Sequence, residues 1–263
     1  MIKKIKAFHF ILILSLLTVV SCEQLSEDTS PPIMSEETFR ILFYDDNTEK
    51  YDSIITSIGG INTDPVEAPN EIILKGLFSD NVLLNRLEFK VTAQNPIEED
   101  EGKMYSKSTT IEDFELPILG TSTNSFKSLD IPGSVISNTY DYVMVVYDEK
   151  ENISKDYTWS LVVKNTNPLI VIDQIGTEYN TGDPITIEGE ITSENNKFLK
   201  EASISFGDSL INIEVPGNTN RVEVNETITF LVSDASSEPQ NLIISAKDDE
   251  DKTAILIQSL LIQ

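Results

Sequence analysis

The sequence predicts an all-β protein built from two tandem β-sandwich modules, and three observations support this. Beyond residue 38 the apolar residues favour a period of two, as in Leu87, Phe89 and Val91, which is typical of half-buried antiparallel strands. Turn-forming clusters such as residues 180–184 interrupt these rows, and no amphipathic helical stretch of convincing length is present. Several sequence blocks also occur twice in the same order. Many short strands without intervening helices indicate a sandwich or barrel, not an α/β fold.

The first element is a secretory leader over residues 1–21. Three lysines precede an apolar stretch at residues 7–20, which is too short for a membrane span. The stretch ends at Ser21-Cys22, and Cys22 is the only cysteine, so it cannot form an intramolecular disulfide. This ending resembles the lipobox of bacterial lipoproteins, whose cysteine is diacylated and becomes the new N-terminus. The resemblance implies lipidation at Cys22 and attachment to a membrane through that lipid.

Removal of the leader limits the chemistry that remains. The only histidine, His9, lies in the leader, so the mature protein has no histidine and no free thiol. Ser-His-Asp and Cys-His nucleophilic sites in their usual forms are therefore excluded, as are zinc sites built from His and Cys. Loss of three leader lysines takes the net charge from −25 to −28, which disfavours DNA and RNA as partners. We expect a protein that is not an enzyme.

Residues 22–37 are polar and acidic and contain a Pro-Pro step, so they predict an extended tether. No aspartate directly follows Cys22, which in the lipoprotein pattern of Gram-negative bacteria argues against retention at the inner membrane. The pair Glu27-Asp28 resembles the acidic export signal of Bacteroidetes-type surface lipoproteins. This resemblance implies an outer-membrane lipoprotein that faces the cell exterior. Attachment that faces the periplasm, with an ordinary solvated linker, is the alternative.

The body of the chain contains an internal repeat. Its matched blocks are residues 72–79 with 185–192, 83–89 with 198–204, and 145–152 with 245–252. The first block carries a glycine between the same apolar positions in both copies, which predicts a bend or bulge in an early strand. The last block is an acidic turn followed by a second apolar row, which is the pattern of a hairpin. The repeat indicates two copies of one module, over residues 38–165 and 167–263.

In each module a strand that ends in aspartate, Asp148 or Asp248, opens the polar turn before the last strand. In this respect the chain resembles the bacterial immunoglobulin-like domains of cell-surface proteins. It departs from their usual Asp-x-x-Gly-Asn turn by having acids and lysine where glycine is expected. The chain also lacks the cysteine pair of antibody domains. The resemblance implies two tandem immunoglobulin-like β-sandwich domains on a lipid tether.

Two connecting segments shape this arrangement. Module 1 is longer by an insertion at about residues 94–127, which holds an acidic run and a Ser/Thr cluster. Loops longer than about 12–15 residues are often functional or disordered, so we expect a long, mobile loop here. The connector at residues 165–168 is short and should hold the modules end to end with limited bending.

The acidic turns are candidate Ca²⁺ sites, because carboxylates supply the hard oxygen ligands that this ion prefers. Neither turn matches the spacing of an EF-hand, and a solvated hairpin turn is the competing interpretation. The candidate ligands are Asp148, Glu149, Asp248, Asp249 and Asp251.

Aromatic residues are the candidates for stacking against a ligand. Trp159 lies on the same face of its predicted strand as Tyr157 and Leu161, so we expect it in the core. Tyr140 and Tyr142 share one strand face and form either an exposed strip or, as packing favours, part of the core. The other candidates, which are not clustered in sequence, are Tyr44, Tyr51, Tyr105 and Tyr179.

Four functions fit these features. The leading interpretation is a non-enzymatic, lipid-anchored cell-surface protein that binds a protein or glycan partner. A glycan-binding accessory lipoprotein of a polysaccharide-uptake system is the second, and an exposed aromatic strip on one face would favour it. A structural spacer is the third. A hydrolase, which would need two carboxylates facing one cleft, is the fourth.

Overall fold

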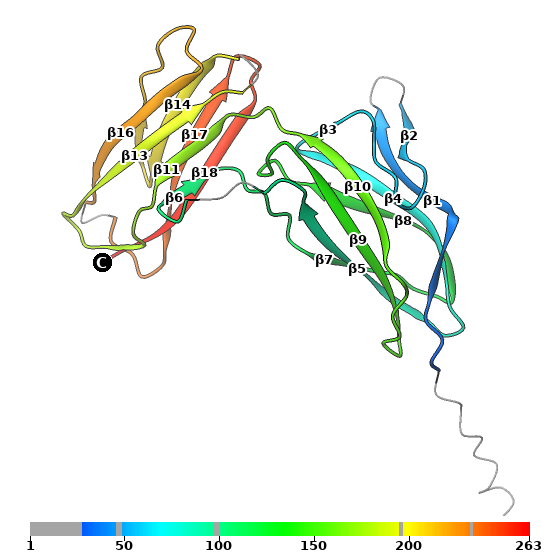
Figure 1. Cartoon of the computed structure of the whole chain (residues 1–263). Coiled ribbons are helices and arrows are strands. Elements are labelled where there is room, and N and C mark those ends of the chain that lie inside the picture. The colour runs from blue at the N-terminus through cyan, green and yellow to red at the C-terminus, as the bar shows by residue number, and fades with distance from the viewer. Residues whose placement is uncertain (1–27, 46–48, 97–99, 195–196, 232–233) are drawn as a thin grey trace, which may run out of the picture.

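The computed structural model describes residues 28–263 except 46–48, 97–99, 195–196 and 232–233. This part of the chain is all-β and forms two sandwiches, each with a four-stranded and a five-stranded sheet, so the predicted fold class is confirmed (Figure 1). It contains no helix that is long and apolar enough to cross a membrane. The predicted leader and the predicted lipidation site at Cys22 lie outside the described residues.

Module 1 packs the sheet β2-β1-β4-β8 against the sheet β3-β10-β9-β5-β7. All of its paired strands run antiparallel except β3, which pairs with β10 in parallel. Its strands are β1 (Ile33–Asp45), β2 (Lys50–Ile55), β3 (Val66–Glu67), β4 (Asn70–Ser79), β5 (Leu84–Ala93), β7 (Phe114–Pro117), β8 (Ser122–Ile131), β9 (Asn138–Asp148) and β10 (Tyr157–Lys164).

Module 2 repeats this plan, with the sheet β16-β13-β11-β6 against the sheet β12-β18-β17-β14-β15. The repeated sequence blocks lie on equivalent strands of the two modules: β4 and β13, β5 and β14, β9 and β17. The strands of this sandwich are β6 (Lys103–Tyr105), β11 (Leu169–Asp173), β12 (Glu178–Tyr179), β13 (Pro184–Thr192), β14 (Leu199–Phe206), β15 (Ser209–Asn212), β16 (Arg221–Thr229), β17 (Gln240–Asp248) and β18 (Thr253–Ile262).

Each sandwich encloses its own core, built from the alternating apolar residues of its strands. Trp159 is 1% exposed at the centre of module 1, where it stacks on Tyr142 with ring centroids 5.3 Å apart. The prediction that Trp159 is a core residue is therefore confirmed. Tyr140 and Tyr142 are also buried, so they form no exposed strip. The core of module 2 is largely aliphatic, with a contact between Phe206 and Phe230.

The prediction that residues 94–127 form one long loop is wrong. The segment contains β6, β7 and the start of β8. β7 pairs with β5 in module 1, whereas β6 crosses to module 2 and pairs with β11. The insertion is therefore a strand-bearing connection between the two sandwiches, and the backbone pairing of β6 and β7 holds it to both.

The predicted boundary between the tether and module 1 is also corrected, because β1 begins at Ile33 and not after residue 37. Ile33 and Met34 pair with the end of β4, and Met34 is buried in the core. The backbone N–H of Met34 also donates a hydrogen bond of 2.7 Å to the hydroxyl of Tyr157. These contacts hold the polar, glutamate-rich start of β1 in the sheet.

The repeated glycine has a different role in each module. In module 2 Gly189 adopts a positive φ of 155°, and a Cβ at this position would lie 2.2 Å from the carbonyl oxygen of Val171. Only glycine lets β11 approach β13 this closely. In module 1 the equivalent Gly76 lies opposite an irregularity in β1, where the register shifts between Ser35 and Arg40. The bulge expected in the glycine-bearing strand is therefore not in β4, which pairs with β8 in unbroken register; the irregularity lies in its partner, β1.

Candidate functional site

The irregularity in β1 creates a shallow hollow on the outer face of the four-stranded sheet of module 1. Side-chain hydrogen bonds of Thr38 replace the backbone hydrogen bonds of a regular strand pair there. Its hydroxyl accepts a hydrogen bond from the N–H of Leu77 (2.9 Å) and donates one to the Ser35 carbonyl (2.8 Å). Phe39 fills the core beneath it. The hollow has a volume of about 280 Å³ and is lined by Thr38, Arg40, Lys75, Leu77 and Asn124.

Two cations face each other across this hollow. Arg40 and Lys75 are direct partners in the β1–β4 register, and like charges in this position destabilise a sheet. Neither forms a salt bridge with any residue that the structure describes. In a chain with a net charge of −25, two adjacent cations without an acidic partner form a local site for an anion.

Both cations are held in place. One guanidinium nitrogen of Arg40, Nη1, donates to the backbone carbonyls of Glu37 (3.1 Å), Phe39 (2.6 Å) and Thr56 (3.0 Å). The ammonium of Lys75 lies 5.1 Å from the centroid of the Phe126 ring, which is a cation–π distance. The site is therefore organised before any ligand arrives.

Exposed aromatic rings lie on the same sheet face. Tyr44 follows Arg40 by four residues on β1 and pairs with Tyr51 on β2, and their ring centroids are 5.0 Å apart. Tyr44 is 40% exposed, Tyr51 55% and Phe126 57%. We call Arg40, Lys75, Phe126, Tyr44 and Tyr51 the cationic-aromatic face. Of the other two tyrosines singled out from the sequence, Tyr105 lies in β6 at the junction and Tyr179 packs against the core of module 2.

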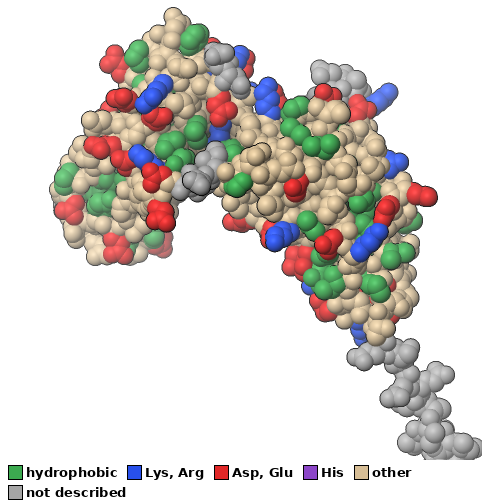
Figure 2. Space-filling view, viewed as in Figure 1, with side chains coloured by type: hydrophobic (Ala, Val, Ile, Leu, Met, Phe, Trp, Pro, Cys, Tyr) green, Lys and Arg blue, Asp and Glu red, His purple; other side chains and the backbone are tan. Residues whose placement is uncertain are grey.

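Basic side chains are scarce in this protein, which has 19 Lys and Arg residues against 44 Asp and Glu residues. Acidic side chains are scattered over both modules in the view of Figure 2, with fewer basic ones between them. Sequence reasoning named the two tyrosines but missed Arg40, Lys75 and Phe126. Only the strand register brings these three residues together. That register depends on the irregularity in β1, which the alternation of apolar and polar residues does not reveal.

The acidic turn of module 1 lies where the tether enters the sandwich. Carboxylate oxygens of Asp28, Asp80 and Asp148 lie within 4.8 Å of one another, an arrangement that can hold a divalent cation. Asp148 is fully buried, and its Oδ1 accepts the N–H groups of Lys150 (2.7 Å) and Asn152 (2.9 Å). A side-chain hydrogen bond from Asn81 is the main cause that lowers the pKa of Asp28.

Of the predicted Ca²⁺ ligands, only Asp148 belongs to this cluster. Asp248 caps its own turn by accepting the N–H groups of Glu250 (3.0 Å) and Lys252 (2.8 Å). Asp251 forms ion pairs with Lys200 and Lys247. Asp249 and Glu149 join no comparable cluster among the residues that the structure describes. Calcium binding stays a prediction, now centred on Asp28, Asp80 and Asp148.

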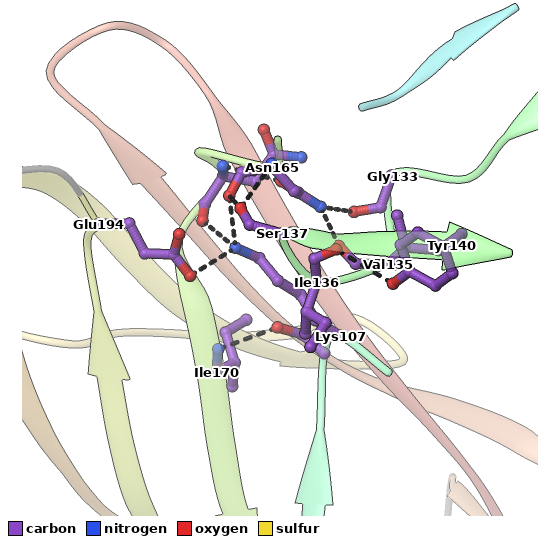
Figure 3. A network of polar contacts seen from close by, with 11 residues as sticks. Lys107, Gly133, Val135, Ile136, Ser137, Tyr140, Asn165, Ile170 and Glu194 are labelled. Carbon is purple, nitrogen blue, oxygen red and sulfur yellow. Dashed lines mark hydrogen bonds and ion pairs between the residues drawn. The ribbon is translucent and has the colours of Figure 1, made fainter. Parts of the chain in front are cut away.

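The junction between the modules is a buried polar network (Figure 3). The ammonium of Lys107, whose side chain is 1% exposed, donates to the carbonyl of Asn167 (2.6 Å) and forms an ion pair with Glu194 (3.0 Å). Burial lowers the pKa of Lys107. Asn165 is fully buried, and its side-chain amide donates to the carbonyls of Gly133 and Val135.

Further contacts connect the two modules at this point. Met104 in β6 packs against the core of module 2, and the N–H of Ser106 donates to the Ile170 carbonyl at 2.9 Å. Lys252 of module 2 forms a salt bridge of 3.0 Å with Glu67 of module 1, which lowers the pKa of that carboxyl. Strand pairing, core packing and ion pairs therefore all act against free rotation of the modules.

Carboxylates also gather in a hollow of about 520 Å³ on the four-stranded sheet of module 2. Glu190 and Glu223 are direct partners in the β13–β16 register, and Glu188 lies two residues before Glu190. Arg221 forms a salt bridge with Glu190, and Lys103 forms one with Asp173. Two of the carboxylates in this hollow, Glu190 and Asp173, are therefore already paired with basic side chains of the protein.

No protein-family model matches the sequence, and no curated protein matches it. Among solved structures, the chain is similar to the fibronectin(III)-like modules of CbhA from Clostridium thermocellum, at 11% identity and a TM-score of 0.24, over 78% of this chain and 88% of that one. Chimeric titin carrying an exogenous decorin peptide is 11% identical, with a TM-score of 0.25 over 90% and 98%. The sialic acid binding region of a Streptococcus sanguinis adhesin is 10% identical, with a TM-score of 0.26 over 90% and 78%. Likenesses this weak carry no conclusion about function.

Proposed function

We propose that this chain is a non-enzymatic, lipid-anchored surface protein that binds an acidic ligand on the cationic-aromatic face of module 1. The observation that carries the proposal is the opposed pair Arg40 and Lys75, which has no acidic partner among the described residues. A protein that keeps a repulsive pair next to open space gains from it when an anion lies between the two charges.

The exposed rings favour carbohydrate as the ligand class. Sugars stack their apolar faces on aromatic rings, while hydroxyl and carboxylate groups bind side chains at the rim of a site. Tyr44 and Tyr51 supply such a platform, and Asn124 and Thr38 line the hollow beside the two cations. A glycan that bears carboxylate or sulfate groups would use both parts of the face.

A rigid arm fits the same proposal. The β6 connection and the buried Lys107 network fix module 2 relative to module 1. A single anchor would then present both the ligand face of module 1 and the surface of module 2 at a fixed geometry. A pure spacer would need the fixed junction but no unpaired cations. The cationic-aromatic face therefore favours a binding role over a spacer role.

A screen of residues 28–263 on an array of neutral, carboxylated and sulfated glycans tests the proposal. We expect binding to anionic glycans that weakens as salt rises, because exposed charges are screened. Tyr51→Ala should weaken this binding, and Leu119→Ala, which removes an exposed apolar side chain elsewhere, should not. Absence of binding to every anionic glycan would refute the assignment of the ligand.

The membrane attachment is tested separately. Cys22→Ser removes the thiol that would carry the lipid, so we expect the full chain to move from the membrane fraction to the soluble fraction. Retention of the variant in membranes would show that Cys22 is not the anchor. Protease shaving of intact cells would distinguish exposure to the exterior from attachment that faces the periplasm.

A further inference from the structure

The last strand of module 1 has a covered edge. Residues 59–62 run along the outer side of β10: the N–H of Gly59 donates to the Thr158 carbonyl (2.7 Å), and the N–H of Ser160 donates to the Gly60 carbonyl (2.9 Å). The side chain of Asn62 then pairs with both backbone groups of Val162, at 2.6 and 3.1 Å. A tight turn at residues 57–60 and the two residues after it thus close this sheet edge.

The equivalent strand of module 2, β18, is covered only at its end. The N–H of Leu261 donates to the Thr177 carbonyl at 2.8 Å, and β12 pairs with Leu261 and Ile262. Among the described residues, only the Gln258 side chain, which donates to the Ser259 carbonyl at 3.1 Å, bonds to the outer side of the strand between Thr253 and Ser259. Because backbone groups alternate in direction along an antiparallel strand, Ile255, Ile257 and Ser259 point theirs outward, as Leu261 does.

The two edges correspond residue by residue. Tyr157 pairs with Met144 on β9, and Leu256 pairs with Ile244, the equivalent residue on β17. Ile257 and Ser259 therefore correspond to Thr158 and Ser160, the residues whose backbone groups are occupied in module 1. Module 2 lacks the covering segment because its chain passes from β11 to β12 in a short connection, whereas module 1 inserts the β2 hairpin there.

The open edge is apolar and has none of the usual protection. Natural sheets guard exposed edges with lysine, proline, bulges or a covering segment. Residues 253–262 contain no charged residue and no proline, and the β17–β18 register has no bulge. Ile255 is 52% exposed and Ile257 is 54% exposed, and Ile257 lies opposite Ile243 on the same sheet face.

A hollow of about 310 Å³ follows the start of this edge. It is bounded by Thr253, Ala254 and Ile255 on one side and by residues of module 1 and the connector, including Pro69, Gly133 and Pro168, on the other. In Figure 1 β18 lies on the side of module 2 nearest module 1. A strand laid along the edge would therefore contact both modules at one end.

We infer that the open edge of β18 binds an extended segment of another protein, which adds a strand to the sheet. The covered edge of module 1 supplies the template for the backbone contacts, because Gly60 and Asn62 bond there to Ser160 and Val162. Apolar side chains at alternate positions of the segment would lie beside Ile255 and Ile257. The segment is neutral or basic, because Asp249 precedes the strand and Glu178 flanks its end, and neither carboxylate forms a salt bridge with a described residue. A second copy of this chain, with the same net charge of −25, is disfavoured as the partner.

The probe is a synthetic peptide of eight residues in which valine alternates with threonine, with one added lysine at each end. Titration of isotope-labelled residues 28–263 with up to about 1 mM peptide should shift the amide signals of Ile257 and Ser259, because their outward N–H groups would pair with the backbone of the peptide. Ser259→Pro removes the outward N–H at an edge position where proline is tolerated, and should abolish these shifts.

Ile257→Lys is the second variant, since a lysine at an edge opposes strand addition without touching the core. We expect at least a tenfold loss of peptide affinity. Thr158→Lys, the matched change on the covered edge of module 1, should bind as the unchanged protein does. Absence of shifts at 1 mM, shifts that persist in both β18 variants, or shifts centred on Thr158 would overturn the inference. So would a dimer in sedimentation that Ile257→Lys abolishes, because a second copy would then occupy the edge.

Discussion

The substitution Asn165→Ala should destabilise module 1 by about 3 kcal/mol. The Asn165 side chain is fully buried and makes three hydrogen bonds: to the Gly133 carbonyl (2.8 Å), to the Val135 carbonyl and from the Asn167 N–H (3.0 Å). Alanine removes all three and leaves the backbone partners unpaired next to the core. Each lost bond of this kind costs about 1 kcal/mol, and the sum approaches the stability margin of a small domain.

Urea unfolding followed by tryptophan fluorescence measures this loss directly. Trp159 is the only tryptophan and lies in the core of module 1, which also contains Val135. With a slope of about 2–3 kcal/mol per molar urea, the midpoint should fall by about 1–1.5 M at an unchanged slope.

A neighbouring asparagine is the matched control. The side chain of Asn167 is partly exposed and forms no hydrogen bond within the described part of the chain, so Asn167→Ala should change stability by less than about 0.5 kcal/mol. A loss below about 1 kcal/mol for Asn165→Ala, or equal losses for the two variants, would refute the role given to the Asn165 side chain at the junction.

Two further predictions concern module 2. Gly189→Ala should lower its stability by about 3 kcal/mol in calorimetry, because a Cβ would lie 2.2 Å from a backbone carbonyl. Gly76→Ala in module 1, where the nearest atoms lie at 3.2 Å and belong to side chains and not to the backbone, should cost about 1 kcal/mol, and equal losses would contradict the difference in packing. Ion pairs with Lys247 and Lys200 lower the pKa of Asp251 to about 2, so carboxyl titration by NMR should give that value, and Lys247→Gln should raise it towards the ordinary 3.8. Since the pKa of Asp251 is depressed in the folded state, the stabilisation is present above the ordinary pKa and is lost as pH falls through about 2. If the pKa of Asp251 in Lys247→Gln stayed at the value of the unchanged protein, the assignment would be contradicted.

The strands of both modules are readable from the sequence because each carries a long alternating row. The rows around Phe89 in β5 and Ile187 in β13 are examples, and their repetition gave the two-module plan. A hydrophobic strand face must be buried, so a period of two is a strong signal even without homologues. The same argument placed Trp159 in the core.

The connections and the sites were not readable in this way. β6 has only three residues, Lys103–Tyr105, and a strand this short has no periodicity to detect. Its partner, β11, is remote in sequence, so nothing local indicates that β6 leaves module 1. The pairing of Arg40 with Lys75 depends on the irregular register of β1, and the cluster around Asp148 joins three distant segments.

The most direct test of the ligand face is a charge reversal with two readouts. Lys75→Glu replaces a repulsive pair with an attractive one opposite Arg40, so the free energy of unfolding should rise by about 0.5–1 kcal/mol while affinity for an anionic glycan falls at least tenfold. Lys90→Glu, the same charge change at an exposed position on the other sheet of module 1, should leave binding unchanged. Greater stability with lost binding is the predicted result. Unchanged glycan affinity in Lys75→Glu would contradict the proposed function.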